Sequence, residues 1–281
     1  MNLLDAGLMG AVQALTEFLP VSSSGHLRLA SAWLGVEGGH DLLFDIVLHL
    51  GTLCAVVWVY RARLFALLQD LFAGLSGMRE GVPAWLRASE GARFAFLVVL
   101  ATVPTGVIGI LLKDLISGDT LGIRVVGGLL CVNAALLALS IKFPGGEEGA
   151  EAGPYSIGGI GPREAVLIGV IQGLAVFPGI SRSGATITMA LALGAYRMKA
   201  AEFSFFLSIP AIIGASLVEF DSAALAQLSG DLTPYIAGAV VSATVGVAAL
   251  LGLLRLLRAA KFHHFAWYCL ALGIAALLFG G

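Results

Sequence analysis

Charged residues are scarce in this chain of 281 residues: Asp, Glu, Lys and Arg together make up 12%, and hydrophobic residues make up 58%. An ordinary soluble domain carries about 25% charged residues. The shortage excludes such a domain and favours a membrane protein. The net charge of −2 also leaves no basic surface for nucleic acid, so we expect no nucleic-acid partner.

Cysteine is scarce as well, with three residues, Cys54, Cys131 and Cys269. Each lies in an apolar segment, and none has the CxxC or Cys/His spacing of a metal site. We interpret all three as small buried hydrophobic residues. The first ten residues lack the Lys and Arg of a secretory signal, so we expect the first apolar segment to be retained.

Long apolar runs, in contrast, are frequent. A helix needs about 20 residues to cross a hydrocarbon core of roughly 30 Å. Full transmembrane helices are predicted at residues 41–60, 93–112, 124–141, 200–220, 235–254 and 262–279. The chain is therefore predicted to be an all-α polytopic membrane protein with six full spans and a single membrane domain over residues 1–281. Residues 64–78 lie between basic residues and are predicted to form a separate interfacial helix.

Two more apolar stretches, residues 2–35 and 161–194, are interrupted midway by Pro, Gly and clustered Ser. Each half of such a stretch is too short to cross the membrane. Backbone that leaves a helix at membrane depth must be buried in protein or face water. We therefore predict two re-entrant helical hairpins.

Basic residues predict the orientation of the chain. Loops rich in Lys and Arg lie in the cytoplasm, and residues 61–93 and 255–261 form two such loops. Counting crossings from these loops places the opening of the first hairpin in the periplasm and that of the second in the cytoplasm. The two hairpins are thus predicted to point at each other.

The chain also contains an internal repeat, because Gly10–Gly25 aligns without gaps with Gly169–Gly184. Both copies contain a Gln in the first half and a Ser-x-Ser-Gly sequence at the end. Three crossings separate the hairpins, so we predict two repeats of inverted topology, about residues 1–142 and 161–281, with a linker over residues 143–160. Such folds place their binding site at the interface of the repeats.

Gln13 and Glu17 lie four residues apart on the first half-helix and therefore share one face. A carboxylate in an apolar segment is costly unless it is paired, faces water or binds a metal. The second copy has Val176 in place of Glu17, so the hairpin itself does not require the acid. Glu17 is therefore a candidate functional residue, with capping of nearby backbone as the alternative.

After the break, three serines and Gly25 open the second half-helix, and His26 follows. Free N–H groups at a helix start attract anions, and serine hydroxyls add donors that suit phosphate. Capping of the helix is the alternative for the serines. His26 has a side chain that can shuttle protons near neutral pH, and packing or capping is its alternative role.

Arg182 lies between Ser181 and Ser183 at the corresponding helix start of the second hairpin. An Arg at this position opposes the helix dipole, so an anion must compensate its charge. A pyrophosphate held by the planar guanidinium is one candidate. A structural salt bridge to Glu17 is the alternative.

Asp45 and His49 form another pair four residues apart, in the first predicted span. They either flank the site or bond to each other at a helix end, and the sequence leaves both alternatives open. Glu202 and Lys113 lie near the ends of spans, where solvation at the membrane interface is sufficient to explain them.

Together, these segments resemble the undecaprenyl-pyrophosphate phosphatase, or bacitracin-resistance, family of bacterial membrane proteins. Two motifs carry the resemblance, which covers essentially the whole chain. One is a Gln/Glu-xxx-Glu helix followed by P-x-S-S-S-G-H, here Gln13–His26, and the other is P-G-x-S-R-S-G-A-T, here Pro178–Thr186.

The resemblance implies a phosphatase of the bacterial inner membrane that converts undecaprenyl pyrophosphate, a C55 polyprenyl pyrophosphate lipid, to undecaprenyl phosphate and inorganic phosphate. This activity recycles the lipid carrier for cell-wall synthesis and confers resistance to bacitracin. The resemblance also implies a divalent-cation cofactor, Mg²⁺ or Ca²⁺, and an active site that faces the periplasm.

Carried over position by position, the resemblance implies four catalytic residues, which are Glu17, Ser23, His26 and Arg182. Glu17 and Gln13 are the implied cation ligands, although the family has either Glu or Gln at the position of Gln13. The predicted substrate-binding residues are Ser22, Ser24, Gly25, Ser181, Ser183, Gly184 and Thr186.

The sequence leaves several points open. The nucleophile is Ser23, His26 or water, and His26 acts either as the base for Ser23 or as the acid for the leaving phosphate. A lipid transporter is the alternative function, because inverted repeats with broken helices are typical of transporters. The oligomeric state is also open, with a homodimer as one alternative.

Overall fold

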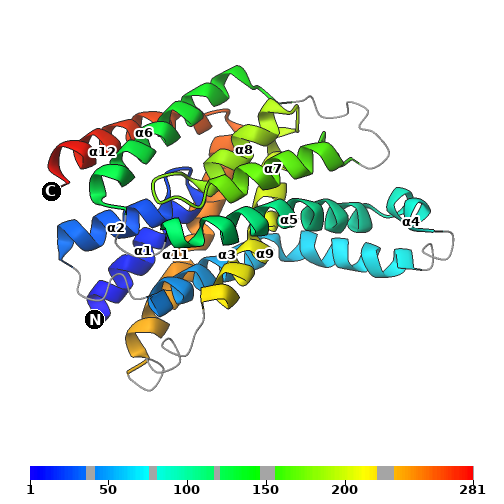
Figure 1. Ribbon diagram of the computed structural model, residues 1–281. Helices are drawn as coiled ribbons and strands as arrows, with labels where there is room; N and C mark the ends of the chain where they lie inside the picture. The colour runs from blue at the N-terminus through cyan, green and yellow to red at the C-terminus, as the bar shows by residue number, and fades with distance from the viewer. Residues whose placement is uncertain (36–41, 76–80, 117–120, 146–155, 220–230, 281) are drawn as a thin grey trace.

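The computed structural model describes residues 1–35, 42–75, 81–116, 121–145, 156–219 and 231–280, and its helices are shown in Figure 1. Apart from one isolated bridge between Ile157 and Ile160, the described residues form helices and connecting turns. The helices are α1 (Leu3–Phe18), α2 (Ser23–Leu34), α3 (Leu42–Ala73), α4 (Val82–Ala88), α5 (Glu90–Ile116), α6 (Ile123–Leu139), α7 (Pro162–Leu174), α8 (Arg182–Ala192), α9 (Arg197–Glu219), α11 (Thr233–Arg258) and α12 (Phe265–Phe279). Two short 3₁₀ turns, Ser140–Lys142 and Phe262–His264, follow α6 and precede α12.

Six helices are long and apolar enough to cross a membrane: α3, α5, α6, α9, α11 and α12 with its preceding 3₁₀ turn. Each overlaps one predicted span, so the six spans and the all-α fold class are confirmed. Large apolar side chains on these helices point outward, and Val99, Ile110 and Leu111 of α5 are more than half exposed. Such a surface is suited to lipid, and the chain is a multi-pass membrane protein.

The prediction of a separate interfacial helix over residues 64–78 is wrong. Helix α3 runs without interruption from Leu42 to Ala73, and residues 76–78 lie outside the described part of the chain. Arg61 and Arg63 mark the edge of the apolar run, but residues 64–73 contain neither Pro nor Gly and are rich in Leu and Ala. These residues favour helix, so the helix continues past the charged boundary.

The two interrupted stretches each form a pair of short helices, α1 with α2 and α7 with α8. The longest of the four is α1, with 16 residues, which at 1.5 Å per residue spans about 24 Å. A helix of that length does not cross a hydrocarbon core of about 30 Å. Figure 1 shows the turn of the first pair beside the turn of the second pair in the centre of the molecule.

The first helix of each pair packs against a long helix from the opposite half of the chain, α1 against α11 and α7 against α5. Glycine makes both contacts close. A Cβ atom on Gly10 would lie 2.5 Å from the carbonyl oxygen of Gly238, and a Cβ on Gly169 would overlap the carbonyl oxygen of Ala101. Gly10 and Gly169 are aligned in the internal repeat. In both copies, therefore, a glycine at the same position allows the backbones of the two packed helices to approach closely.

Glu202, for which we predicted only solvation at the end of a span, instead takes part in an ion-pair network. It accepts hydrogen bonds from Arg63 Nε at 2.7 Å and from Lys199 Nζ at 3.0 Å. Arg63 also pairs with Glu90 at the start of α5. The network therefore connects α3, α5 and α9.

We expect Gly10→Ala to lower the stability of the folded protein, because its methyl group would overlap the backbone of α11. Overpacking of this kind costs about 1–3 kcal/mol. Gly7→Ala is the matched control, since Gly7 lies on the same helix and a Cβ there has no atom within 4 Å. The measurement is the thermal unfolding midpoint in detergent. Equal midpoints for the two variants would contradict the close α1–α11 packing.

Candidate functional site

The candidate site forms where the turns of the two short-helix pairs meet. The backbone N–H of Gly179 donates a hydrogen bond of 2.9 Å to Ser22 Oγ. The hydroxyl of Ser183 donates one of 3.1 Å to the carbonyl oxygen of Phe18. Residues more than 150 positions apart are thus joined directly, and each turn satisfies backbone groups that the other leaves free.

Asn133 of α6 links the two turns a second time. Its Nδ2 atom donates to the carbonyl oxygen of Pro20 at 2.9 Å, and its Oδ1 atom accepts from the backbone N–H of Ser181 at 3.0 Å. The side chain is completely buried. Our sequence interpretation missed this residue, although a lone amide in an apolar span was a usable signal.

The carboxylate of Glu17 is the centre of the site. It forms an ion pair with Arg182, accepts the hydroxyl of Ser23 at 2.6 Å and accepts Nε2 of Gln13 at 3.2 Å. Its side chain is only 7% exposed, and a buried carboxylate requires such compensation. The structure therefore brings together Gln13, Glu17, Ser23 and Arg182, three of them among the four predicted catalytic residues.

Local structure explains this arrangement. Gln13 and Glu17 occupy one face of α1 because they are four residues apart. Ser23 and Arg182 are the first residues of α2 and α8, so each lies at a helix start that faces the meeting point. The ion pair that the sequence left as a structural alternative is present, and Arg182 remains partly exposed.

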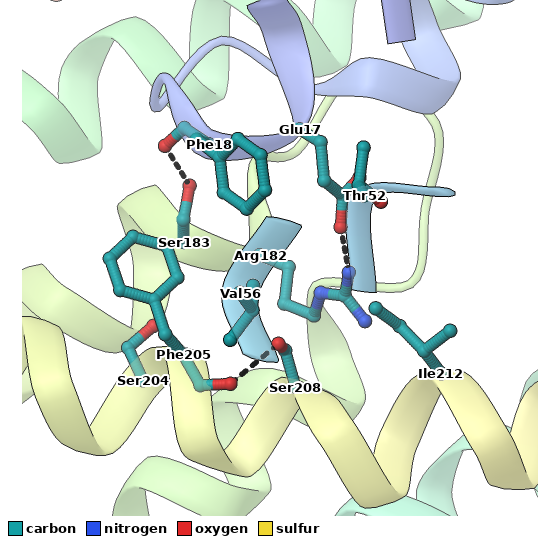
Figure 2. Close-up of a pocket in the computed structure, with 10 residues that line it drawn as sticks. All are labelled: Glu17, Phe18, Thr52, Val56, Arg182, Ser183, Ser204, Phe205, Ser208 and Ile212. Carbon is teal, nitrogen blue, oxygen red and sulfur yellow. Dashed lines mark hydrogen bonds and ion pairs between the residues drawn. The ribbon is translucent and has the colours of Figure 1, made fainter. Parts of the chain in front are cut away.

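Figure 2 shows a pocket next to this ion pair. Glu17 and Arg182 form its charged part, and α3 and α9 supply the opposite wall. The other lining residues are Phe18, Thr52, Val56, Ser183, Ser204, Phe205, Ser208 and Ile212. The wall mixes apolar side chains with hydroxyl side chains, and the guanidinium of Arg182 beside it suits an anionic ligand.

The start of α2 is strained. Ser22 caps the helix with φ of +72° and ψ of 96°, a conformation that residues other than glycine rarely adopt and that costs about 1–3 kcal/mol. Its Oγ atom accepts from the N–H of Gly25 and of Gly179. The surrounding contacts hold the strained turn, and strain of this kind is typical of functional sites.

Several predicted substrate-binding residues bond within the protein. Ser181 Oγ lies 3.1 Å from Ser183 Oγ and accepts the N–H of Gly184, and Thr186 Oγ1 lies 2.6 Å from Ser204 Oγ. Ser181 thus caps the start of α8, and Thr186 joins α8 to α9. Ser24 is partly exposed at the start of α2 and Gly25 is buried, and contact of all seven residues with substrate stays a prediction.

The two ring nitrogens of His26 bond to residues other than Glu17 and Arg182. Its Nδ1 atom is 2.7 Å from the carbonyl oxygen of Ser22, and its Nε2 atom is 2.8 Å from the hydroxyl of Tyr268. In this arrangement the hydroxyl of Ser23 bonds to Glu17 and not to His26. The role of His26 as base or acid stays a prediction.

His49 lies at the site, as one alternative for the Asp45–His49 pair stated, and it also bonds to Asp45, as the other stated. Its Nε2 atom is 3.7 Å from Glu17 Oε2, and its Nδ1 atom is 2.8 Å from the backbone carbonyl oxygen of Asp45. The imidazole is thus directed at the carboxylate by a bond to its own helix. The sequence could not place His49 beside Glu17, because the distance depends on how α3 packs against α1.

The donor set is suited to a hard divalent cation. Gln13 Oε1 is buried and has no hydrogen-bond partner among the described residues, and Glu17 supplies a carboxylate beside it. Oxygen ligands of this kind are those that Mg²⁺ and Ca²⁺ prefer. Within the described residues no group of three or more His, Cys, Asp or Glu side chains gathers, and cation binding by Gln13 and Glu17 stays a prediction.

Comparison with known proteins gives a consistent result over the full length. A family model described as "Bacitracin resistance protein BacA" matches residues 6–275. The chain is similar to a protein of Methanosphaera stadtmanae named "Undecaprenyl-diphosphatase", with 39% identity over 99% of this chain and 98% of the relative. Proteins of the same name from Desulfosudis oleivorans and Desulfatibacillum aliphaticivorans are 39% and 38% identical, and each alignment covers at least 99% of both chains.

We expect Asn133→Ala to destabilise the protein, because it leaves the Pro20 carbonyl and the Ser181 N–H unpaired in the interior. Each buried group left without a partner costs about 1–3 kcal/mol. The measurement is the thermal unfolding midpoint in detergent. Val132→Ala on the exposed side of the same helix is the control, and an equally small effect of both variants would contradict the bridging role.

Proposed function

This chain belongs to the bacitracin resistance protein BacA family, and from that premise we propose that it hydrolyses undecaprenyl pyrophosphate to undecaprenyl phosphate and inorganic phosphate. One observation carries the proposal: Ser23 and Arg182, at two helix starts, both contact the buried carboxylate of Glu17 beside a pocket. A nucleophile, a base and an anion-binding group thus lie within reach of one another.

Binding of the pyrophosphate begins at Arg182. Its guanidinium is partly exposed and is suited to two oxygens of a phosphate group. The backbone N–H groups of Ser23 and Ser24 at the start of α2 have no acceptor within the helix and add donors for the same anion. Arg182 must release the carboxylate of Glu17 in order to bind the pyrophosphate. The Glu17 carboxylate is then free to accept a proton.

Ser23 is the proposed nucleophile and Glu17 the proposed base. The Ser23 hydroxyl already donates to Glu17 at 2.6 Å, a distance suited to proton transfer. Ser23 Oγ attacks the terminal phosphorus, its proton passes to Glu17, and undecaprenyl phosphate leaves. Water then cleaves the phosphoserine, which releases inorganic phosphate and restores the hydroxyl.

His26 and a divalent cation complete the proposal. His26 lies three residues beyond Ser23 on α2, on the same side of the helix, where its Nε2 atom can accept a proton from the water that cleaves the phosphoserine. Glu17 Oε1, which Arg182 releases, would hold Mg²⁺ or Ca²⁺ together with Gln13, whereas Glu17 Oε2 accepts the Ser23 proton. The bound cation would neutralise charge on the pyrophosphate oxygens.

The proposed topology is two inverted repeats, residues 1–142 and 161–281, each beginning with a re-entrant hairpin. It is supported by the reciprocal packing of α1 on α11 and of α7 on α5, with Gly10 and Gly169 at aligned positions. Six crossings also require both termini on one side, and Figure 1 shows the two termini at the same end of the bundle.

The proposed orientation places the active site towards the periplasm of the bacterial inner membrane. Arginine is concentrated between the apolar part of α3 and the beginning of α5, at Arg61, Arg63, Arg87 and Arg93, which suits the cytoplasm. In this setting the enzyme recycles the lipid carrier of cell-wall synthesis, and bacitracin resistance follows from removal of the pyrophosphate.

A lipid transporter is the second candidate function, because the broken helices meet at the interface of the proposed repeats. Binding alone, however, requires no serine hydroxyl on a buried carboxylate, whereas the Ser23–Glu17 contact is what hydrolysis needs. The two candidates are separated by measuring phosphate release.

We expect detergent-purified protein to release phosphate from a C15 or C55 isoprenyl pyrophosphate, and a chelator to abolish release until Mg²⁺ or Ca²⁺ is added. Glu17→Ala and Arg182→Ala should each lower kcat/KM by about 10²–10³-fold, because each loses a charged group that stabilises the transition state. Arg124→Ala, at the exposed start of α6, is the control. Substrate binding without any release by folded wild-type protein would favour the transporter.

Ser23→Ala should lower kcat by a factor on the order of 10³ or more, as loss of a nucleophile does in other hydrolases. Ser31→Ala on the same helix is the control, since Ser31 Oγ has no hydrogen-bond partner among the described residues. The measurements are steady-state phosphate release and acid trapping of phosphoserine from labelled substrate. Near wild-type turnover by Ser23→Ala would exclude the covalent mechanism and leave His26 or water as the nucleophile.

A further inference from the structure

Tyr268 contacts the predicted catalytic histidine from outside both sequence motifs. It lies on α12, and its hydroxyl is 2.8 Å from His26 Nε2. The two rings are nearly parallel, with an angle of 11° between their planes and 5.6 Å between their centroids. Two features thus fix the imidazole relative to α12, a hydrogen bond and a ring contact.

The partners of His26 decide where its hydrogen lies. Nδ1 is 2.7 Å from the backbone carbonyl oxygen of Ser22, and a carbonyl oxygen can only accept, so Nδ1 carries the hydrogen. In the neutral imidazole Nε2 then presents its lone pair, and the hydroxyl of Tyr268 is the donor. Tyr268 and Ser22 therefore select a single tautomer.

Nε2 is the ring nitrogen that can accept a proton, since Nδ1 already carries the hydrogen that it donates to the Ser22 carbonyl. His26 is buried, whereas Tyr268 is about half exposed, so Tyr268 lies between the imidazole and the surface of the bundle. The direction in which Nε2 points is thus set by a residue that is 242 positions away in the sequence.

The position of Tyr268 is itself fixed by packing. The neighbouring Cys269 is buried and lies with Sγ 3.8 Å from the carbonyl oxygen of Pro20. Further along α12, a Cβ on Gly273 would lie 2.7 Å from the carbonyl oxygen of Gly127, so α6 and α12 are in close contact. The helix therefore presents Tyr268 to the α1–α2 turn in one register.

We propose that Tyr268 is a positioning residue of the hydrolase, which holds His26 in the tautomer and ring orientation needed for Nε2 to accept a proton from the water that cleaves the phosphoserine. This inference rests on the proposed function. Tyr268 acts through His26, so its loss lowers the rate of the chemical step and leaves capture of the pyrophosphate by Arg182 unchanged.

The first test compares Tyr268→Phe with Trp267→Phe. Phe keeps the ring contact with His26 and removes only the hydroxyl, and Trp267 is an exposed neighbour on the same helix. Tyr268→Phe should lower kcat by about ten- to a hundredfold with little change in KM, as loss of an orienting partner does elsewhere, and Trp267→Phe should retain wild-type values. An unchanged kcat for Tyr268→Phe would overturn the proposal.

The second test is independent of activity. In protein labelled with ¹⁵N-histidine, Tyr268→Phe should shift the Nε2 signal of His26, which is identified by its disappearance in His26→Gln. An unshifted signal would overturn the proposal. If wild-type protein releases no phosphate, the proposed function fails, yet this signal still reports on the Tyr268–His26 bond.

A double-mutant comparison completes the test. If Tyr268 acts through His26, Tyr268→Phe should change kcat by less than about twofold in a His26→Ala background, because the shared contact is already lost. A full ten- to a hundredfold loss in that background would show that Tyr268 acts by another route and would overturn the proposal.

Discussion

The buried carboxylate of Glu17 is the constraint on which the rest of the site depends. A charge at this depth is stable only with compensation, and its main partner, Arg182, comes from the other half of the chain. Neither hairpin can therefore form its charged site alone. The ion pair requires that both turns reach the centre of the bundle, and the close packing at Gly10 and Gly169 brings them there.

The broken helices create a second requirement, because their free backbone groups must be bonded inside the protein. Ser22, Ser183 and Asn133 meet much of this requirement by bonding across the two turns. Several serines that the sequence suggests as hydrogen-bond donors to phosphate therefore also stabilise the fold. Ser23 differs, since its hydroxyl is directed at Glu17.

Arg182 has two roles that compete. It neutralises Glu17 in the structure, and in the proposed mechanism it binds the pyrophosphate. The arrival of substrate would thus remove the main partner of Glu17 at the moment when that carboxylate has to accept a proton. His49, 3.7 Å from the same carboxylate, keeps one further polar group beside it.

The sequence by itself determined the six spans, the two interrupted stretches and most of the residues around Glu17, because these follow from runs of apolar residues, from helix-breaking residues and from charges in apolar segments. It misjudged the end of α3, since charged residues mark the membrane boundary whereas Gly and Pro end a helix. Only the tertiary structure decided that Asn133 joins the turns, that His49 faces Glu17 and that His26 bonds to Tyr268. Each of these contacts links helices distant in the sequence, and its geometry depends on how those helices pack.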